Sequence, residues 1–291
     1  MKIGILFIAT GRYICFWKDF YKACEKYLLK NHEKTYFLFT DAELKKIPEN
    51  VVLVKHNCLG WPNETLLRFE TFLKVEKELE KMDYIYFING TMKPVSEVGD
   101  EILPTEEQGL MTVENEWRYK EEPDTYINYE RNPESTAYIP YGTKHKDVMG
   151  GFNGGTRRAF LKMAHELAVN TRKDLDKGII AVFHDESHLN KYILDKNVLI
   201  LPPNYGILEF NPLLESSYNY WNKDNLEEFQ KDIKMIILNK NSPRYGGFDY
   251  MRSLSDKKSF TVKDYFRGFF RKAFNFMKNK IMKPMLKKVK K

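Results

Sequence analysis

Two adjacent carboxylates flanked by histidines mark the segment of this chain that is best suited to chemistry. The segment His184-Asp185-Glu186-Ser187-His188 comes after the apolar run 178–182. Carboxylates beside so much apolar surface are costly to bury unless they are paired or functional. The pattern therefore predicts that this acidic pair belongs to an active site.

A metal site is the competing interpretation of the same segment. His184 and His188 are spaced i, i+4 on an expected helix, and such spacing can place two imidazoles on one zinc ion. In zinc proteases, however, the general-base glutamate directly follows the first histidine, and here that position is Asp185. We therefore favour the carboxylates as the reactive groups.

Extended by Leu-Asn-Lys-Tyr at 189–192, the segment resembles the catalytic segment of family 6 glycosyltransferases, which include the blood-group A and B transferases and the α1,3-galactosyltransferases. The resemblance covers roughly residues 1–255. It implies transfer of a sugar from a UDP-sugar with retained anomeric configuration. In such a transfer Glu186 would form a covalent intermediate or stabilise an oxocarbenium-like transition state. Asp185 would hold sugar hydroxyls, and His184 would be a further sugar contact.

The first expected strand, Ile3–Ala9, should end at the nucleotide, because ligands of doubly wound sheets bind at the carboxyl ends of strands. By position, the resemblance assigns contacts with uracil to Ile8, Ala9, Thr10 and Tyr13. For Tyr13 the alternative is a purely structural role at the strand end.

The segment expected to lie at the donor diphosphate differs from that of the animal members of the family. They carry Asp-x-Asp for a divalent metal, whereas this chain has Asn89-Gly90-Thr91, and neutral oxygens bind a hard cation weakly. Bacterial relatives with Asn-x-Asn work without metal. The resemblance thus implies no metal and no other cofactor, with Asn89 and Thr91 beside the nucleotide. Arg68 would reach the phosphate and the sugar of the donor, and Lys240 and Arg252 would neutralise the diphosphate through charge-assisted hydrogen bonds. The alternative for these cations is simple solvation.

A glycine-rich segment bears on the donor sugar. Met149, Gly150 and Gly151 open the loop 149–156, which matches the loop that separates galactose from N-acetylgalactosamine in the blood-group enzymes. Methionine at 149 resembles the galactose enzyme. Glycine at 151 resembles the N-acetylgalactosamine enzyme, because a missing Cβ leaves room for an acetamido group. We expect UDP-N-acetylgalactosamine as donor, with UDP-galactose as the alternative.

The acceptor site differs from the family pattern. The His-Pro-aromatic segment of the relatives appears here as Val-Glu-Asn-Glu-Trp at 113–117. Trp117 can stack on the face of an acceptor sugar, while Glu114 and Glu116 alter the chemistry. The acceptor is therefore expected to be an oligosaccharide or lipid-linked glycan, galactoside-like, that can differ from those of the relatives.

The elements that must position these residues alternate between strands and helices, which indicates an α/β sheet with ligands at its carboxyl edge. By resemblance it is a GT-A-type, Rossmann-like mixed sheet flanked by helices. Segment 114–146 lacks periodicity and is expected to be a functional loop. The patterns predict strands at 3–9, 35–40, 51–54, 84–88, 198–201 and 235–238, and helices at 14–29, 64–81, 156–174 and 185–195.

Charge divides the chain in two. Residues 257–291 hold 13 Lys and Arg against one Asp, so the net charge of +7 for the chain leaves −5 for residues 1–256. The basic pI therefore does not indicate nucleic-acid binding. Residues 257–291 predict a basic amphipathic helix with aromatics on one face, which suits an anionic membrane surface. A helix packed on the body and a nucleic-acid tail are the alternatives.

These patterns predict a glycosyltransferase domain, 1–256, and a membrane-associating tail, 257–291, in a bacterial enzyme of surface glycan synthesis. Three cysteines without framework spacing favour reduced thiols, and no run is long enough to span a bilayer. We therefore expect a cytoplasmic protein at the inner face of the cell membrane. The rival interpretation is a non-catalytic glycan- or glycolipid-binding protein on the same fold.

Overall fold

The computed structural model describes residues 1–119, 121–209, 229, 231–240 and 242–252. The expected basic helix and the domain boundary after residue 256 lie outside these residues. The strands, in chain order, are β1 (Lys2–Ile8), β2 (Glu33–Thr40), β3 (Val51–Lys55), β4 (Tyr84–Ile88), β5 (Met92–Pro94), β6 (Leu110–Glu114), β7 (Val148–Thr156), β8 (Leu199–Leu201), β9 (Ile207–Leu208) and β10 (Met235–Ile237).

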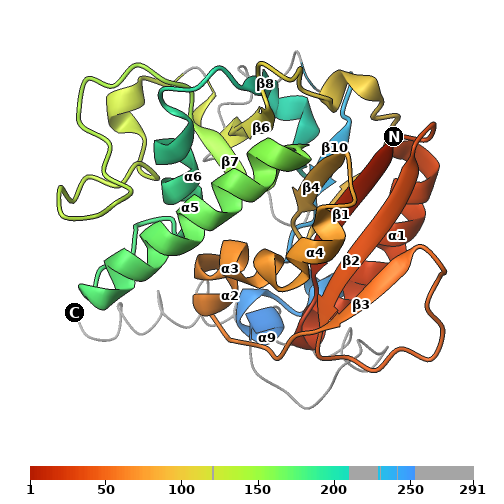
Figure 1. Ribbon diagram of the computed structural model, residues 1–291. Coiled ribbons are helices and arrows are strands. Elements are labelled where there is room, and N and C mark those ends of the chain that lie inside the picture. The colour runs from red at the N-terminus through yellow and green to blue at the C-terminus, as the bar shows by residue number, and fades with distance from the viewer. Residues whose placement is uncertain (120, 210–228, 230, 241, 253–291) are drawn as a thin grey trace, which may run out of the picture.

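A mixed seven-stranded sheet in the order β3-β2-β1-β4-β7-β6-β8 forms the centre of the described structure (Figure 1). The strands β3, β2, β1 and β4 run parallel, as the alternation of strands and helices predicted. Strand β7 runs antiparallel to both of its neighbours. A separate three-stranded sheet, β5-β10-β9, includes the strand that was expected at 235–238. The α/β class and the mixed sheet are thus confirmed.

Helices cover the sheet, and the longest of them, α5, crosses in front of it in Figure 1. None of the helices in the described part of the chain is both long and apolar enough to cross a membrane. The α-helices are α1 (Ile14–Tyr27), α2 (Asn63–Leu66), α3 (Arg68–Phe72), α4 (Glu76–Leu79), α5 (Arg157–Asp176), α6 (Asp185–Ile193) and α9 (Phe248–Arg252).

Side chains from both faces of β1 are buried, which explains why this strand reads as a continuous apolar run. On one face Ile3, Ile5 and Phe7 pack in one cluster with Phe16 and Phe20 of α1. The ring centroids of Phe7 and Phe20 lie 4.1 Å apart. This packing fixes β1 against α1, and with it the turn at the end of β1 where the nucleotide is expected.

The second cluster lies on the opposite face of the sheet. Leu6 of β1 and Phe87 of β4 pack there with Phe69 and Phe72 of α3 and Phe160 of α5. Helices α3 and α5 are therefore anchored on the same side of the sheet. This arrangement holds the start of α3, and so Arg68, beneath the carboxyl end of β4.

Two expected elements differ from the structure. The helix expected at 64–81 is divided into α2, α3 and α4, with breaks at Leu67 and Val75, where ψ is 20° and 23°. The loop expected at 149–156 is strand β7. Glycines weaken an isolated strand, but a Cβ at Gly154 would lie 2.3 Å from Tyr86 Cδ1, so tertiary packing requires glycine there.

All three cysteines are unpaired thiols, as their spacing predicted. The start of β7 meets the carboxyl end of β4, where the Asn89 amide donates to the Gly151 carbonyl at 2.8 Å. Because β7 is antiparallel, its first residues lie at the same sheet edge as the ends of β1 and β4. The residues that the sequence singled out are thereby brought to one edge.

Candidate active site

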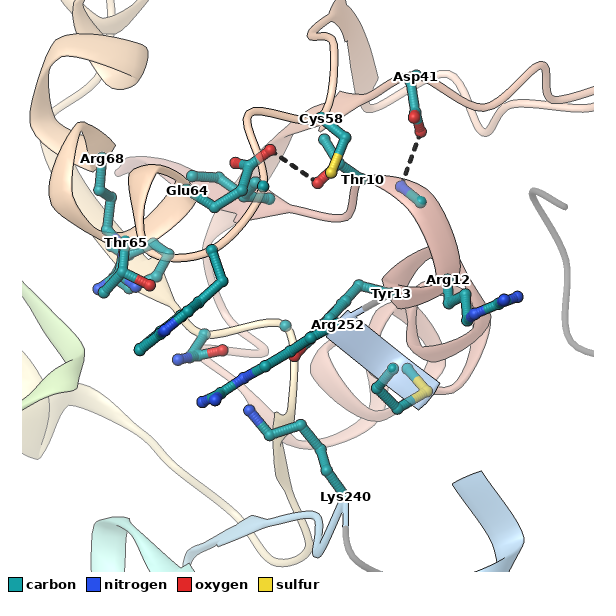
Figure 2. Close-up of a pocket in the computed structure, with 18 residues that line it drawn as sticks. Thr10, Arg12, Tyr13, Asp41, Cys58, Glu64, Thr65, Arg68, Lys240 and Arg252 are labelled. Atoms are coloured by element: carbon teal, nitrogen blue, oxygen red, sulfur yellow. Dashed lines mark hydrogen bonds between the residues drawn. The ribbon is translucent and has the colours of Figure 1, made fainter. Parts of the chain in front are cut away.

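A cavity of about 300 Å³ lies at the carboxyl ends of β1 and β4 (Figure 2). Its walls come from six parts of the chain: the β1 end, the β2 end, the segment before and within α2, the start of α3, the β4 end, and residues 240–252. The lining residues are Ile8, Thr10, Gly11, Arg12, Tyr13, Asp41, Cys58, Gly60, Trp61, Glu64, Thr65, Arg68, Phe87, Asn89, Gly90, Lys240, Met251 and Arg252.

Two of the cations that line the cavity lie opposite its carboxylates, whereas Arg68 lies beside Glu64 (Figure 2). Figure 2 shows Lys240 and Arg252 reaching into it from the side opposite Glu64 and Asp41. Arg252 stacks on Trp61, with its Cζ 3.9 Å from the ring centroid. Such a cavity suits a ligand that has an anionic end and a neutral, hydroxyl-rich end.

The carboxylate side is built by hydrogen bonds that join three loops. The Thr10 hydroxyl donates to Glu64 Oε1 at 2.9 Å, and the Leu59 amide donates to the same oxygen at 2.8 Å. Glu64 Oε2 lies 3.2 Å from His56 Nε2. Burial acts to raise the pKa of Glu64, but these hydrogen bonds outweigh it and lower the pKa. Glu64 is thus a charged residue whose hydrogen bonds hold these segments together in the cavity wall.

Arg68 and Asp185 form a buried ion pair behind the cavity. The Arg68 side chain is 7% exposed and that of Asp185 is 3% exposed. The guanidinium also donates to the Gly150 carbonyl at 3.2 Å and lies 4.3 Å from the Phe87 ring centroid. Burial raises the pKa of Asp185 to about 7, although the Arg68 charge acts in the opposite direction.

A second cavity, of about 460 Å³, holds Glu186. Asn89 lines both cavities, so the two lie next to each other. Its lining residues are Asn89, Thr91, Met92, Asn115, Trp117, Ile127, Asn128, Met149, Gly151, Phe183, Glu186 and Ile237.

Both oxygens of the Glu186 carboxylate accept hydrogen bonds. The Gly150 amide donates to Oε2 at 2.7 Å, and Asn128 Nδ2 donates to Oε1 at 3.2 Å. A Cβ at residue 150 would lie 3.1 Å from Glu186 Cβ, so glycine allows α6 to approach β7 this closely. Hydrogen-bond donors on both oxygens favour an ionised, oriented carboxylate.

The structure brings most of the predicted residues to these cavities. Four of the predicted residues line neither cavity: Ala9, Gly150, His184 and Asp185. Ala9 is fully buried and hydrogen-bonds to β2 through both its amide and its carbonyl. Gly150 and Asp185 lie directly behind Glu186 and Arg68, and the His184 ring packs edge-on against Trp61, 4.8 Å between centroids.

His184 and His188 make different contacts. His184 has φ 55° and ψ −124° just before α6, a strained conformation of the kind that concentrates at functional sites. His188 is buried, with Nε2 3.7 Å from Asp174 Oδ2. Within the described residues, no three His, Cys, Asp or Glu side chains group in a way that could hold a metal ion.

Three residues were expected near the acceptor, and the structure places one of them, Trp117, at the Glu186 cavity. Trp117 is 45% exposed and lines the Glu186 cavity. Glu116 instead is buried and accepts the Leu208 amide at 3.0 and 3.1 Å, and burial raises its pKa well above the usual range. Glu114 pairs with Lys146 at 2.7 Å. Neither glutamate lines either of these two cavities, so their expected effect on the acceptor is not direct.

Several lining residues were not singled out as functional in the sequence, among them Trp61, Glu64 and Asn128. Trp61 and Glu64 stand in the segment Gly-Trp-Pro-Asn-Glu at 60–64, and a tryptophan beside a proline was a usable signal. Asn128 lies in the irregular segment between β6 and β7, where no pattern distinguishes it.

We expect UDP binding to weaken above a pH of about 8, because Lys240 then loses its proton. Burial, aided by Arg252 and Arg68, lowers the pKa of Lys240 to about 8. A bound diphosphate favours the charged form, so binding should take up a proton at about pH 8.5. Calorimetry in buffers of different ionisation enthalpy measures this uptake. It should vanish in Lys240→Met and persist in Lys234→Met, whose ion pair with Asp232 lies outside the cavity. Equal uptake in both variants would contradict the assignment.

Comparison with known proteins points to one family. A family model described as Glycosyltransferase family 6 matches residues 1–212. The match ends before Lys240 and Arg252, and so is shorter than the region expected from the motifs. The chain is 34% identical over 210 residues to the Escherichia coli O-antigen biosynthesis glycosyltransferase WbnI. The aligned region covers 71% of this chain and 88% of that protein.

Two animal proteins are similar over a comparable stretch. The chain is 32% identical over 216 residues to histo-blood group ABO system transferase 2 of Rattus norvegicus, covering 70% of this chain and 62% of that protein. It is 28% identical over 217 residues to globoside alpha-1,3-N-acetylgalactosaminyltransferase 1 of Gallus gallus, covering 70% and 61%. The chain thus spans less than two thirds of the length of these two relatives.

Proposed function

Because the chain belongs to glycosyltransferase family 6, we propose that it transfers N-acetylgalactosamine, or galactose, from the UDP-sugar in α-1,3 linkage to a galactoside-like acceptor, with retained configuration. The observation that carries the proposal is the junction of the two cavities at Asn89. The UDP moiety lies in the cavity of Arg68, Lys240 and Arg252, and the sugar extends past Asn89 toward Glu186.

The arrangement supports one sequence of bond changes. The bond from the anomeric carbon to the β-phosphate oxygen breaks, and UDP leaves with the electron pair into the cation side of the cavity. The Glu186 carboxylate meets the positive charge that develops at that carbon, either by bonding to it or by electrostatic stabilisation. An acceptor hydroxyl, held near Trp117, then bonds to the carbon from the face that UDP left and gives its proton to the departing diphosphate. Where Glu186 has bonded to the carbon, that bond breaks in the same step and its electron pair returns to the carboxylate.

Incubation of the full-length chain with each UDP-sugar tests the proposal. We expect slow release of UDP without acceptor and faster release with a galactoside, the product carrying a new α-linked sugar. UDP binding with neither hydrolysis nor transfer, for any UDP-sugar and across a panel of oligosaccharides, would favour a non-catalytic binding protein instead.

Activity is expected without a divalent metal. Asn89 and Thr91 offer neutral oxygens where carboxylates would be needed for a hard cation, and Lys240 and Arg252 can meet the diphosphate charge instead. Turnover in excess EDTA should equal turnover without it. Activity that disappears with the chelator and returns with manganese would contradict this prediction.

Gly151→Ala should shift the donor preference toward UDP-galactose. Gly151 lines the Glu186 cavity, and a Cβ there would lie 3.0 Å from Met92 Sδ and 3.6 Å from Asn89 Cβ. The added methyl narrows the space for an acetamido group, a mismatch worth about 1–3 kcal/mol. The ratio of kcat/KM for the two donors measures the effect. An unchanged ratio would mean that residue 151 does not face the acetamido group.

We further propose that residues 257–291 bind an anionic membrane surface through their cations and aromatics, at the inner face of the cell membrane. The acceptor would then be a lipid-linked glycan in bacterial surface glycan synthesis. The name of the Escherichia coli relative, an O-antigen biosynthesis glycosyltransferase, supports this setting.

A further inference from the structure

A buried asparagine bridges Glu186 and a second carboxylate. Asn128 is 2% exposed, and its Nδ2 donates to Glu186 Oε1 at 3.2 Å and also to Asp147 Oδ1. A primary amide carries two N–H groups, so each carboxylate can take one of them. The opposite orientation of the amide would set its carbonyl oxygen against two carboxylates. The chemistry of the neighbours therefore fixes which way Asn128 points.

The backbone of Asn128 is tied to the helix that carries Glu186. The Ser187 hydroxyl donates to the Asn128 carbonyl at 2.7 Å and accepts the Phe183 amide at 3.0 Å. Ser187 follows Glu186 in the first turn of α6. The amide of Asn128 and the carboxylate of Glu186 are thus fixed relative to each other, although Asn128 lies in an irregular segment.

Glu186 needs such a restraint because its long side chain has several rotatable bonds. The Gly150 amide holds one carboxylate oxygen from β7, and Asn128 holds the other from the opposite direction. Asn128 Nδ2 also donates to Asp147 Oδ1, so its amide places N–H donors between two acidic side chains.

We propose that Asn128 is a positioning residue, which sets the plane of the Glu186 carboxylate toward the anomeric carbon. The inference rests on the proposed function and assigns Asn128 to the chemical step rather than to nucleotide binding. Asn128 lines the Glu186 cavity and is absent from the wall of the nucleotide cavity. Its loss should therefore lower kcat and leave the binding of UDP unchanged.

The test compares the full-length chain with Asn128→Leu, which keeps the shape and removes both donors, and with Asn128→Ser, which keeps one hydroxyl donor. Asn204→Leu is the matched control, because Asn204 is also a buried amide with one donated hydrogen bond but lines neither cavity. For each variant we would measure kcat and KM for the UDP-sugar, UDP affinity by calorimetry, and the thermal midpoint.

We expect kcat to fall at least about tenfold in Asn128→Leu and less in Asn128→Ser, with KM and UDP affinity within about twofold, since an interaction made in the transition state changes kcat. Asn204→Leu should keep kcat. An unchanged kcat in Asn128→Leu, a rise in KM alone, or unfolding of both Asn128 variants would overturn the inference. A wild-type chain that neither transfers nor hydrolyses any UDP-sugar would instead refute the proposed function.

Discussion

Glu186→Gln is expected to reduce sugar transfer by on the order of a thousandfold or more while the chain still binds UDP. The substitution removes the negative charge that would meet the anomeric carbon. It also costs a hydrogen bond, because both oxygens of Glu186 accept from N–H donors and a glutamine offers only one acceptor there. Transfer to a galactoside, measured by UDP release, gives the size of the loss.

UDP affinity separates catalysis from structure in this variant. Glu186 lines the second cavity and is absent from the wall of the nucleotide cavity, so calorimetry should give nearly the wild-type affinity. Glu116→Gln is a matched control: Glu116 is a buried glutamate that accepts a backbone amide, and it lines neither cavity. Loss of UDP binding in Glu186→Gln, or equal loss of transfer in both variants, would mark Glu186 as structural.

The first half of the sheet could be predicted from the sequence because its strands are buried on both faces. The continuous apolar runs of β1, β2 and β4 leave little choice of structure, and the helical periodicity of α1 and α5 is regular. Strand β7 could not be predicted. Its four glycines weaken the local signal, and only tertiary contacts, such as those of Gly154 with Tyr86 and of Gly150 with Glu186, explain why glycine stands there.

The candidate site was predictable where a motif carried it. Glu186, Arg68 and Asn89 were named from short segments, and the structure places them along two adjacent cavities. Asn128 was not predictable, because its role depends on the position of Asp147 and Glu186, which lie 19 and 58 residues farther along the chain. Hydrogen bonds between distant segments leave no pattern in a single sequence.

Arg68→Met is expected to destabilise the fold by about 3–5 kcal/mol, because it leaves Asp185 buried without its partner. Both side chains of this ion pair are less than one tenth exposed. Chemical denaturation measures the loss. The matched control is Arg172→Met, which breaks an exposed ion pair with Glu70 at 2.7 Å, where the two side chains are 52% and 43% exposed. An exposed pair of this kind contributes about 0–1 kcal/mol, so that variant should remain nearly as stable as wild type.

The double variant Arg68→Met, Asp185→Leu separates the two roles of the pair. Two apolar side chains in place of a buried ion pair are often neutral or stabilising, so most of the lost stability should return. Activity should not return, because the nucleotide cavity has lost the Arg68 charge. A stable double variant with weakened UDP binding and no transfer is the expected result. Recovery of transfer together with stability would mean that the pair serves the fold alone and that Lys240 and Arg252 suffice for the diphosphate.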